Sequence, residues 1–316
     1  MTFIQCPRVG RPVAGPPHQR CRPRHGSKAT RVEGVPSPPH PHRAKRNNPP
    51  RSKAPGPRLY RHVVAPDTGD PLAPLRRDPA TAGIFSDFDG TLSPIVDHPQ
   101  LAEPVAGVPR LLAELARRYA VVAVVSGRPV AFLAAHLPAS VLLAGLYGLE
   151  VQRHGERQFD PEAERWRAAV SAAVTRLRAL APPGVLVEPK GLSVTCHYRT
   201  NPSLEPQVMA LAQEVAAATG LVAHAGRKSV ELLPPIHADK GTVIRKWAAP
   251  LRSACYLGDD LGDLAAFRAL DQLATQGIST VRIAVRSDEA PAELLQAADM
   301  IIDTPEGTAG LLRTLL

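Results

Sequence analysis

The chain has 316 residues, 44% of them hydrophobic, so it can bury a sizeable core in one to three domains. Its formal charge of +9 is unevenly distributed, because residues 1–60 hold 13 Lys and Arg against one acid, while the rest holds 25 basic and 28 acidic groups. The folded part is therefore not a basic nucleic-acid-binding surface, and with no apolar run of 18 residues and no secretory pattern we expect no membrane span and no signal peptide.

Residues 1–75 are predicted to form a disordered, basic, proline-rich tail. Residues 1–60 contain 13 of the 34 prolines and show no apolar periodicity, so they cannot bury enough surface to offset the entropy of ordering. Such a tail could contact nucleic acid or an anionic membrane, or be a transit peptide, or be an upstream extension without function. We favour the last interpretation and expect neither nucleic acid nor membrane as a partner.

The four cysteines show neither metal-ligand spacing nor a disulfide framework. They are Cys6, Cys21, Cys196 and Cys255. This usage is typical of a reducing compartment, and we expect the cytoplasm.

Strands and helices alternate between residues 83 and 145. The predicted elements are a strand at 83–87, a helix at 104–118, a strand at 120–125, a helix at 129–136 and a strand at 141–145. Continuous β-branched runs such as 120–125 are typical of strands buried on both faces. The alternation predicts an α/β fold with a doubly wound, parallel, Rossmann-like sheet.

The pattern changes after residue 148 and returns near residue 239. In between, the predicted elements are a polar hairpin at 149–159, a helix at 161–180, a strand pair at 185–198, a helix at 203–219 and a strand pair at 221–233. Thereafter they are a helix at 240–249, a strand at 254–258, a helix at 260–270, strands at 280–285 and 299–303 and a helix at 305–315. We therefore predict a catalytic core of residues 76–148 and 227–316, interrupted by an inserted α/β cap domain at 149–226.

Two acids lie directly after the first predicted strand, in the run Asp87-Phe88-Asp89-Gly90-Thr91. At this spacing both carboxyl groups can face one site, where one attacks phosphorus and the other protonates the leaving alkoxide. Two anions this close also attract a divalent cation. A helix N-cap or an Asx turn would explain the same residues without chemistry.

A second motif, Ser126-Gly127-Arg128, follows the strand at 120–125. A hydroxyl group and free backbone N–H groups at a helix start form an anion site, although serine is also an ordinary helix cap. Lys240 lies at the start of another predicted helix. A cation there opposes the helix dipole, which suggests that it serves an anion, although it could be a solvated surface lysine.

Three acids, Asp259, Asp260 and Asp263, follow the strand at 254–258. They form a set of oxygen ligands for a cation, or they are acids that a helix N-terminus favours. Because ligands bind at the carboxyl ends of strands in open α/β sheets, the four motifs together predict one site.

The order of these motifs resembles the haloacid-dehalogenase superfamily of phosphatases. The roles that the resemblance implies are nucleophile for Asp87, general acid and base for Asp89, phosphoryl binding for Ser126 and charge neutralisation for Lys240. It also implies an Mg²⁺ site built from Asp87, the backbone carbonyl of Asp89 and Asp259, supported by Asp260 and Asp263.

Longer strings over residues 80–316 resemble the trehalose-6-phosphate phosphatase family. These strings are 87–95, 125–128, 145–150, 188–199, 231–235, 239–241 and 258–263. The resemblance implies a cap that closes over a disaccharide phosphate, with Lys190 and Glu231 on its hydroxyl groups, and sugar recognition does need such oriented donors and acceptors. The substrate-binding residues that it implies are Asp87, Phe88, Asp89, Ser126, Gly127, Arg128, Lys190 and Glu231, with His197 and Arg199 as further candidates. Without the resemblance, Lys190 could be a turn lysine and Glu231 an exposed strand acid.

The chain departs from that family's usual residues at Tyr147, Leu233, Gly262 and Leu264, which bears on sugar specificity only. We expect a monomeric phosphatase that hydrolyses trehalose 6-phosphate through an aspartyl-phosphate, in trehalose biosynthesis. The alternatives are another capped sugar phosphatase, of the sucrose-phosphate or mannosylphosphoglycerate type, and a non-catalytic sugar-phosphate-binding module.

Overall fold

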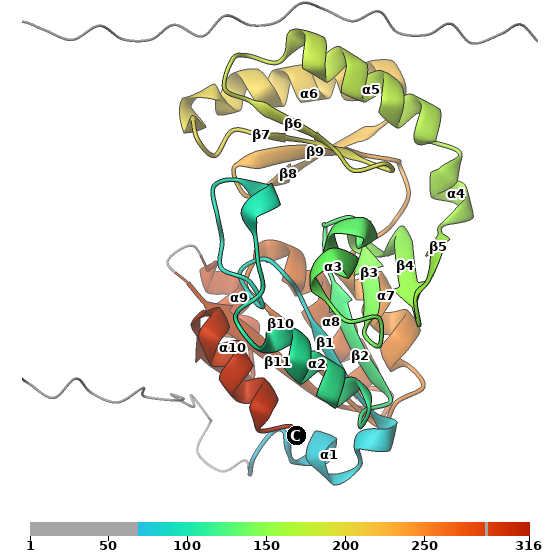
Figure 1. Cartoon of the computed structure of the whole chain (residues 1–316), viewed down its shortest axis with the longest axis vertical. Helices are drawn as coiled ribbons and strands as arrows, with labels where there is room; N and C mark the ends of the chain where they lie inside the picture. Colours follow the sequence, from blue (N-terminus) through green and yellow to red (C-terminus); the bar gives the residue numbers. More distant parts are fainter. Residues whose placement is uncertain (1–68, 288–289) are drawn as a thin grey trace, which may run out of the picture. The chain divides into compact units, whose positions relative to one another are not determined.

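A computed structural model of the chain describes residues 69–287 and 290–316 (Figure 1). Residues 1–68 of the predicted tail lie outside the described residues, so its disorder stays a prediction. The last residues assigned to the tail are packed, because helix α1 (Ala73–Arg77) buries Leu75 completely and Leu72 almost completely. The packed chain thus begins before residue 76.

The larger of two β-sheets carries the predicted alternating pattern. Its strands are β1 (Ala82–Ser86), β2 (Val121–Val125), β3 (Leu142–Gly145), β4 (Glu150–Arg153), β5 (Glu156–Phe159), β10 (Ser253–Gly258), β11 (Ser279–Arg286) and β12 (Met300–Asp303). They lie in the order β12-β11-β10-β1-β2-β3-β4-β5; the first six strands are parallel, β4 is antiparallel to β3, and β5 is antiparallel to β4. The central strand β1 is buried along its whole length, and β2, predicted to be buried on both faces, is buried except at its first residue, Val121.

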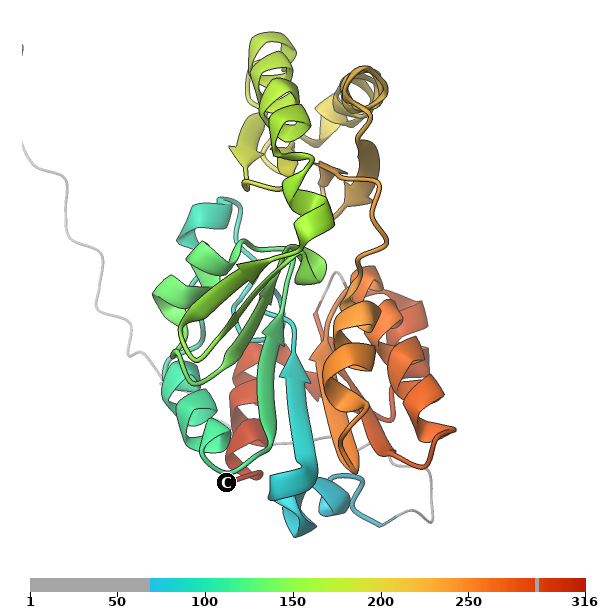
Figure 2. The same ribbon diagram turned by 90° about the vertical axis from the view of Figure 1, so that its right-hand side faces the viewer.

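Helices cover both faces of this sheet (Figure 2). On one face lie α2 (Val108–Ala116), α3 (Val130–His136) and α10 (Thr304–Arg313), and on the other α7 (Lys240–Ala248), α8 (Leu264–Ala274) and α9 (Ala292–Ala297). Successive strand residues point to opposite faces, so Ile84 joins the first apolar cluster and Phe85 the second. The predicted doubly wound α/β core is confirmed.

The smaller sheet belongs to the inserted cap. Its strands are β6 (Leu186–Pro189), β7 (Val194–His197), β8 (Val222–Gly226) and β9 (Ser229–Leu233), in the antiparallel order β6-β7-β9-β8. Helices α5 (Arg167–Leu180) and α6 (Glu205–Thr219) cover one face (Figure 1). Val194 and Cys196 pack under these helices, whereas Thr195 and His197 lie on the opposite face and line a cleft. Alternation along one strand thus makes one face apolar and the other polar.

The structure differs from the predicted elements at several points. The helix expected at 161–180 is broken into α4 (Pro161–Glu164) and α5, because the backbone N–H groups of Arg165 and Trp166 donate to the carbonyls three residues back and not four. Helices α1 and α9 were not predicted; each is only five or six residues long, too short for a clear periodic signal.

Sheet membership also bears on the domain boundaries, which stay a prediction. Strands β4 and β5, at 150–159, extend the larger sheet, and β9 belongs to the smaller one. By this criterion the inserted unit begins and ends later in the chain than the predicted 149–226. No helix within 69–287 or 290–316 combines the length and apolar character that crossing a bilayer requires.

Candidate active site

The predicted motifs meet at one edge of the larger sheet. Strands β10, β1 and β2 are adjacent and parallel, so the residues after their carboxyl ends lie side by side. Asp87 follows β1, Ser126 follows β2 and Asp259 follows β10. This edge forms one wall of a cleft of about 550 Å³, and the polar face of the cap sheet forms another.

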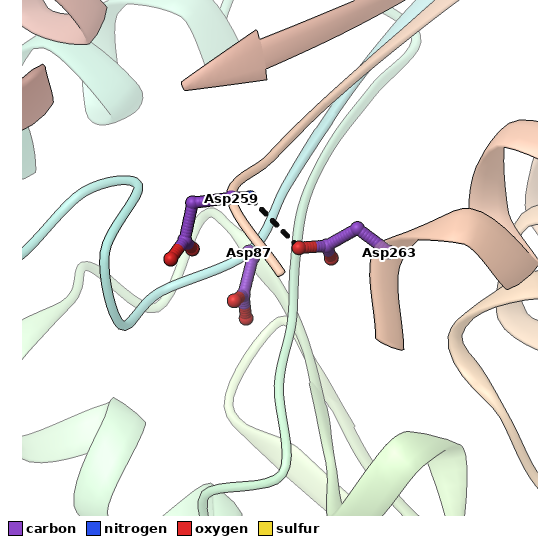
Figure 3. Close-up of side chains that lie close together, drawn as sticks. All are labelled: Asp87, Asp259 and Asp263. Carbon is purple, nitrogen blue, oxygen red and sulfur yellow. Dashed lines mark hydrogen bonds between the residues drawn. The ribbon is translucent and has the colours of Figure 1, made fainter. Parts of the chain in front are cut away.

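Three buried acids form a tight cluster at this edge. Carboxylate oxygens of Asp87, Asp259 and Asp263 all lie within 4.8 Å of one another (Figure 3). Gly90 makes room for the cluster, since a Cβ atom on it would lie 2.0 Å from Asp259 Oδ2, and its φ of +81° also favours glycine. The Thr91 hydroxyl donates to Asp259 Oδ1 at 3.0 Å and fixes that carboxylate.

Lys240 places a positively charged ammonium group beside the acidic cluster. Its Nζ lies 3.0 Å from Asp87 Oδ2 and donates to Asp263 Oδ1 at 2.6 Å. The side chain is buried, and Asp239 caps the helix that carries it by accepting from the Thr242 backbone N–H at 2.7 Å. Burial lowers the pKa of Lys240, but Asp263 and Asp87 raise it more, so the group stays charged.

The Asp263 carboxylate accepts hydrogen bonds from neighbouring residues and does not line the cleft. Besides Lys240, its Oδ1 accepts from the Tyr256 hydroxyl at 2.6 Å, and its Oδ2 accepts from the backbone N–H groups of Asp259 and Asp260 at 2.8 and 2.9 Å. Both oxygens are therefore used, which suits the supporting role predicted for Asp263. Each Asp259 oxygen accepts one side-chain hydrogen bond, from Thr91 or from Arg227, and a carboxylate oxygen has a second lone pair, so Asp259 can still join Asp87 in holding a cation.

The acids of the cluster are short of positive charge. Burial raises the pKa of Asp87 well above its usual range and Asp263 adds to this, although Lys240 lowers it. Burial and the neighbouring carboxylates raise the pKa of Asp259 to about 7. A buried set of carboxylate oxygens that ionises reluctantly fits a hard divalent cation, whose charge would stabilise the ionised forms.

Asp89 lies in the cleft but outside the acidic cluster. Arg128 donates from Nε and Nη2 to the two Asp89 oxygens, at 2.7 Å each, and from Nη1 to the Pro99 carbonyl at 2.7 Å. The Arg128 guanidinium also lies 4.4 Å from the centre of the Phe132 ring. The Asp89 side chain is thus committed to Arg128, and only its backbone carbonyl is left for the predicted metal site.

Ser126 and Gly127 line the cleft as predicted, whereas Phe88 does not. Ser126 is buried and its Oγ accepts from the Arg128 backbone N–H at 3.2 Å. A Cβ atom on Gly127 would lie 2.7 Å from the Tyr147 hydroxyl, so a side chain at this position would require Tyr147 to move. The Phe88 ring is fully buried in an edge-to-face contact with Phe132, so only the backbone of Phe88 could reach a substrate.

Lys190 and Glu231 meet in the cleft. Lys190 Nζ donates to Glu231 Oε1 at 3.2 Å and to the Gly127 carbonyl of the core at 3.1 Å. Glu231 also accepts from the Ser193 hydroxyl at 2.6 Å and from the Tyr147 hydroxyl at 3.2 Å. The pair predicted to bind sugar hydroxyls thus touches the core directly above the Ser126 motif.

Three further contributors were not predicted. Arg227, in the turn between β8 and β9, lies 3.1 Å from Asp259 Oδ2 through Nη1. Tyr147 and Ser193 hold Glu231. Nothing in the sequence around Arg227 indicates a functional residue. Ser193, in contrast, directly precedes β7 and lies two residues before Thr195, so strand alternation could have placed it on the same face as the cleft residues.

The remaining candidates divide between the cleft and the apolar clusters. His197 and Arg199 line the cleft, and His197 Nε2 lies 2.7 Å from Glu188 Oε2. Of the unusual residues, Tyr147 and Gly262 line the cleft, but Leu233 and Leu264 pack into apolar clusters. Leu233 and Leu264 are thus not among the residues that line the cleft.

Known proteins resemble this chain in sequence and in fold. The sequence model of the family described as trehalose-phosphatase matches residues 85–299. A trehalose-phosphate phosphatase of Mycobacterium marinum is 38% identical over 223 residues, covering 65% of this chain and 54% of that protein. One of Mycolicibacterium paratuberculosis is 35% identical over 240 residues, covering 72% and 60%.

Solved structures share the fold. A trehalose-6-phosphate phosphatase related protein matches with a TM-score of 0.64 and 24% identity, covering 74% of this chain and 96% of that one. The C-terminal domain of the Candida albicans trehalose-6-phosphate phosphatase matches with a TM-score of 0.63 and 22% identity, covering 77% and 95%.

The match with the curated relatives is partial on their side, since the chain spans only 54% to 60% of the two mycobacterial proteins. The family model, in contrast, matches 215 residues of this chain, from 85 to 299, and these include all four motifs of the cleft. The chain belongs to the trehalose-phosphatase family.

Proposed function

We propose that this chain hydrolyses trehalose 6-phosphate to trehalose and phosphate, with Mg²⁺ as cofactor and Asp87 as nucleophile. The observation that carries the proposal is the composition of the cleft. Its core wall holds Asp87 beside Lys240 and the buried acids, and its cap wall holds the Lys190–Glu231 pair. One wall thus suits a phosphoryl group and the other a polyol, as family membership leads one to expect.

The core residues have distinct tasks in this reaction. An Asp87 oxygen attacks phosphorus in line and the bond to the sugar oxygen breaks, while Asp89 gives that oxygen a proton. Asp89 then takes a proton from the water that hydrolyses the aspartyl-phosphate. Since Arg128 holds both Asp89 oxygens, it must turn away, and the entering phosphoryl group offers it an alternative anion.

Lys240 and the proposed cation would neutralise the negative charge of the nucleophile and of the phosphoryl group. Lys240, 3.0 Å from Asp87, neutralises the nucleophile and the transferring phosphoryl group. Asp87 and Asp259, with the Asp89 carbonyl, would hold Mg²⁺, which supplies charge neutralisation and orientation of the phosphoryl oxygens. Ser126 offers its hydroxyl to the phosphoryl group, and Asp263 keeps Lys240 and the Asp259 loop in place.

Phosphate release from a panel of sugar phosphates tests the proposal. Trehalose 6-phosphate should be the best substrate in Mg²⁺, ahead of glucose 6-phosphate, sucrose 6-phosphate and mannosylphosphoglycerate. EDTA should abolish the activity and Mg²⁺ should restore it. A preference for another disaccharide phosphate would overturn the substrate, full activity in EDTA would overturn the metal, and no hydrolysis at all would indicate a binding module.

A further inference from the structure

One buried hydroxyl group on the cap wall forms no hydrogen bond among the described residues. Thr195 is 2% exposed, and its Oγ1 has no hydrogen-bond partner within residues 69–287 and 290–316. Buried hydroxyl groups are nearly always hydrogen-bonded, because leaving one unpaired destabilises the fold. A valine would fill the same volume without that cost, so the hydroxyl at this position calls for an explanation.

The position of Thr195 supplies that explanation. It lies at the middle of β7, on the face that lines the cleft, whereas its neighbours Val194 and Cys196 face the cap helices. In the sheet register it stands directly between Glu188 on β6 and Glu231 on β9. Opposite residues of antiparallel strands project from the same face with Cβ atoms about 5 Å apart, so Thr195 is flanked by two carboxylates.

Both flanking carboxylates already have partners. Glu188 is paired with His197, and Glu231 accepts from Lys190 and Ser193. The two carboxylates are therefore fixed as acceptors on either side of Thr195, and neither of them forms a hydrogen bond with its hydroxyl. A hydroxyl that can both donate and accept, set in such a row, matches a neutral polyol.

We propose that Thr195 is a specificity-determining residue that hydrogen-bonds a hydroxyl group of the sugar part of the substrate. This inference rests on the proposed function, because it requires a sugar phosphate in the cleft. Thr195 lies on the cap sheet, whereas the acidic cluster and Lys240 belong to the core, so its contribution concerns recognition and not phosphoryl transfer.

The test compares two substitutions at Thr195 with one elsewhere. Thr195→Val removes the hydroxyl at nearly constant volume, and Thr195→Ser keeps it. Thr308, in α10, is the matched control, since its hydroxyl is also buried without a partner among the described residues but lies away from the cleft. Each variant is assayed with trehalose 6-phosphate and with p-nitrophenyl phosphate, which carries no sugar, and its melting temperature is recorded.

Thr195→Val should lower the ratio of kcat/KM for trehalose 6-phosphate to that for p-nitrophenyl phosphate by about 3- to 10-fold, the usual effect of one neutral hydrogen bond. Its melting temperature should stay level or rise, because an unpaired buried hydroxyl is lost. Thr195→Ser should keep most of the ratio, and Thr308→Val should leave it unchanged.

Three outcomes would count against the inference, and they differ in meaning. If the wild type prefers trehalose 6-phosphate and Thr195→Val keeps the full ratio, Thr195 binds at most water and this inference alone is wrong. If the wild type shows no preference for any sugar phosphate over p-nitrophenyl phosphate, the proposed function fails and the Thr195 contact fails with it. A fall in the ratio together with a loss of melting temperature in Thr195→Val but not in Thr195→Ser would instead indicate a structural hydroxyl and overturn the inference.

Discussion

The two walls of the cleft hold carboxylates in opposite electrostatic conditions. On the core wall, burial raises the pKa of Asp87 well above its usual range and that of Asp259 to about 7. On the cap wall, burial also raises the pKa of Glu188, but the hydrogen bond with His197 and the charge of Lys190 outweigh it, so the net pKa is lowered.

This contrast shows what each wall can bind. The core acids outnumber their cations, so the core wall can accept further positive charge, as a metal site must. The cap acids are held by hydrogen bonds, Glu188 to His197 and Glu231 to Lys190 and Ser193, so the cap wall offers acceptors and donors in fixed positions. Such a surface suits neutral hydroxyl groups. Four experiments test this difference between the walls, and they follow in order of expected effect.

The largest effect is expected at the nucleophile. Asp87→Asn should lower turnover to below about a hundredth of wild type on trehalose 6-phosphate and on p-nitrophenyl phosphate alike, because the attacking oxygen is lost. Mass spectrometry should detect no aspartyl-phosphate. Asp160→Asn is the control, since Asp160 caps α4 away from the cleft and asparagine caps equally well. Turnover above that level in Asp87→Asn would rule out the covalent mechanism.

A smaller and selective effect is expected on the cap wall. Lys190→Ala and Glu231→Ala should each lower kcat/KM for trehalose 6-phosphate by about 10- to 150-fold, which corresponds to about 1.5–3 kcal/mol for a charged hydrogen bond. Hydrolysis of p-nitrophenyl phosphate should fall far less, since it offers no sugar. Equal losses on both substrates would mean that the pair supports the core, to which Lys190 is linked through the Gly127 carbonyl.

Without metal, the stability of the folded protein should depend on pH through Asp259, one of the core acids. Because the folded pKa of Asp259 is raised to about 7, the folded state holds this proton more tightly than the unfolded chain does between about pH 4 and pH 7. The contribution of Asp259 to stability therefore declines as pH rises through that window.

Melting temperatures in EDTA measure this effect. The wild type should lose stability relative to Asp259→Asn as pH rises from about 5 to about 8, and Mg²⁺ should remove the loss because the cation compensates the ionised carboxylate. Parallel curves for wild type and variant in EDTA would show that Asp259 has an ordinary pKa, and the charge argument for the core wall would fail.

The smallest effect is expected from the N-terminal segment. Deleting residues 1–68 should leave the melting temperature and both activities nearly unchanged, because this segment lacks the apolar periodicity that packing requires. A drop of several degrees would show that the segment docks on the folded part. Loss of activity on trehalose 6-phosphate alone would place the segment at the cap wall.

Local sequence was sufficient for the core wall. Unbroken apolar runs mark strands buried on both faces, and polar residues directly after them mark the carboxyl edge of a parallel sheet. Parallel strands bring these ends together whatever the details of packing, so Asp87, Ser126 and Asp259 converge as predicted. The strand pairs that alternate with helices likewise indicated the inserted cap, although the predicted hairpin at 149–159 joins the larger sheet.

The sequence by itself thus determined the α/β class, the edge that carries the site and the residues that gather there. Only the tertiary structure decided the partners: Arg128 on Asp89, Arg227 on Asp259, and Tyr147 with Ser193 on Glu231. The same holds for Phe88, whose ring turns into the core although it stands between two site residues. The physical reason is that strand and helix patterns are set by neighbours two to four residues away, whereas these contacts join segments up to 84 residues apart, whose meeting depends on how the whole chain packs.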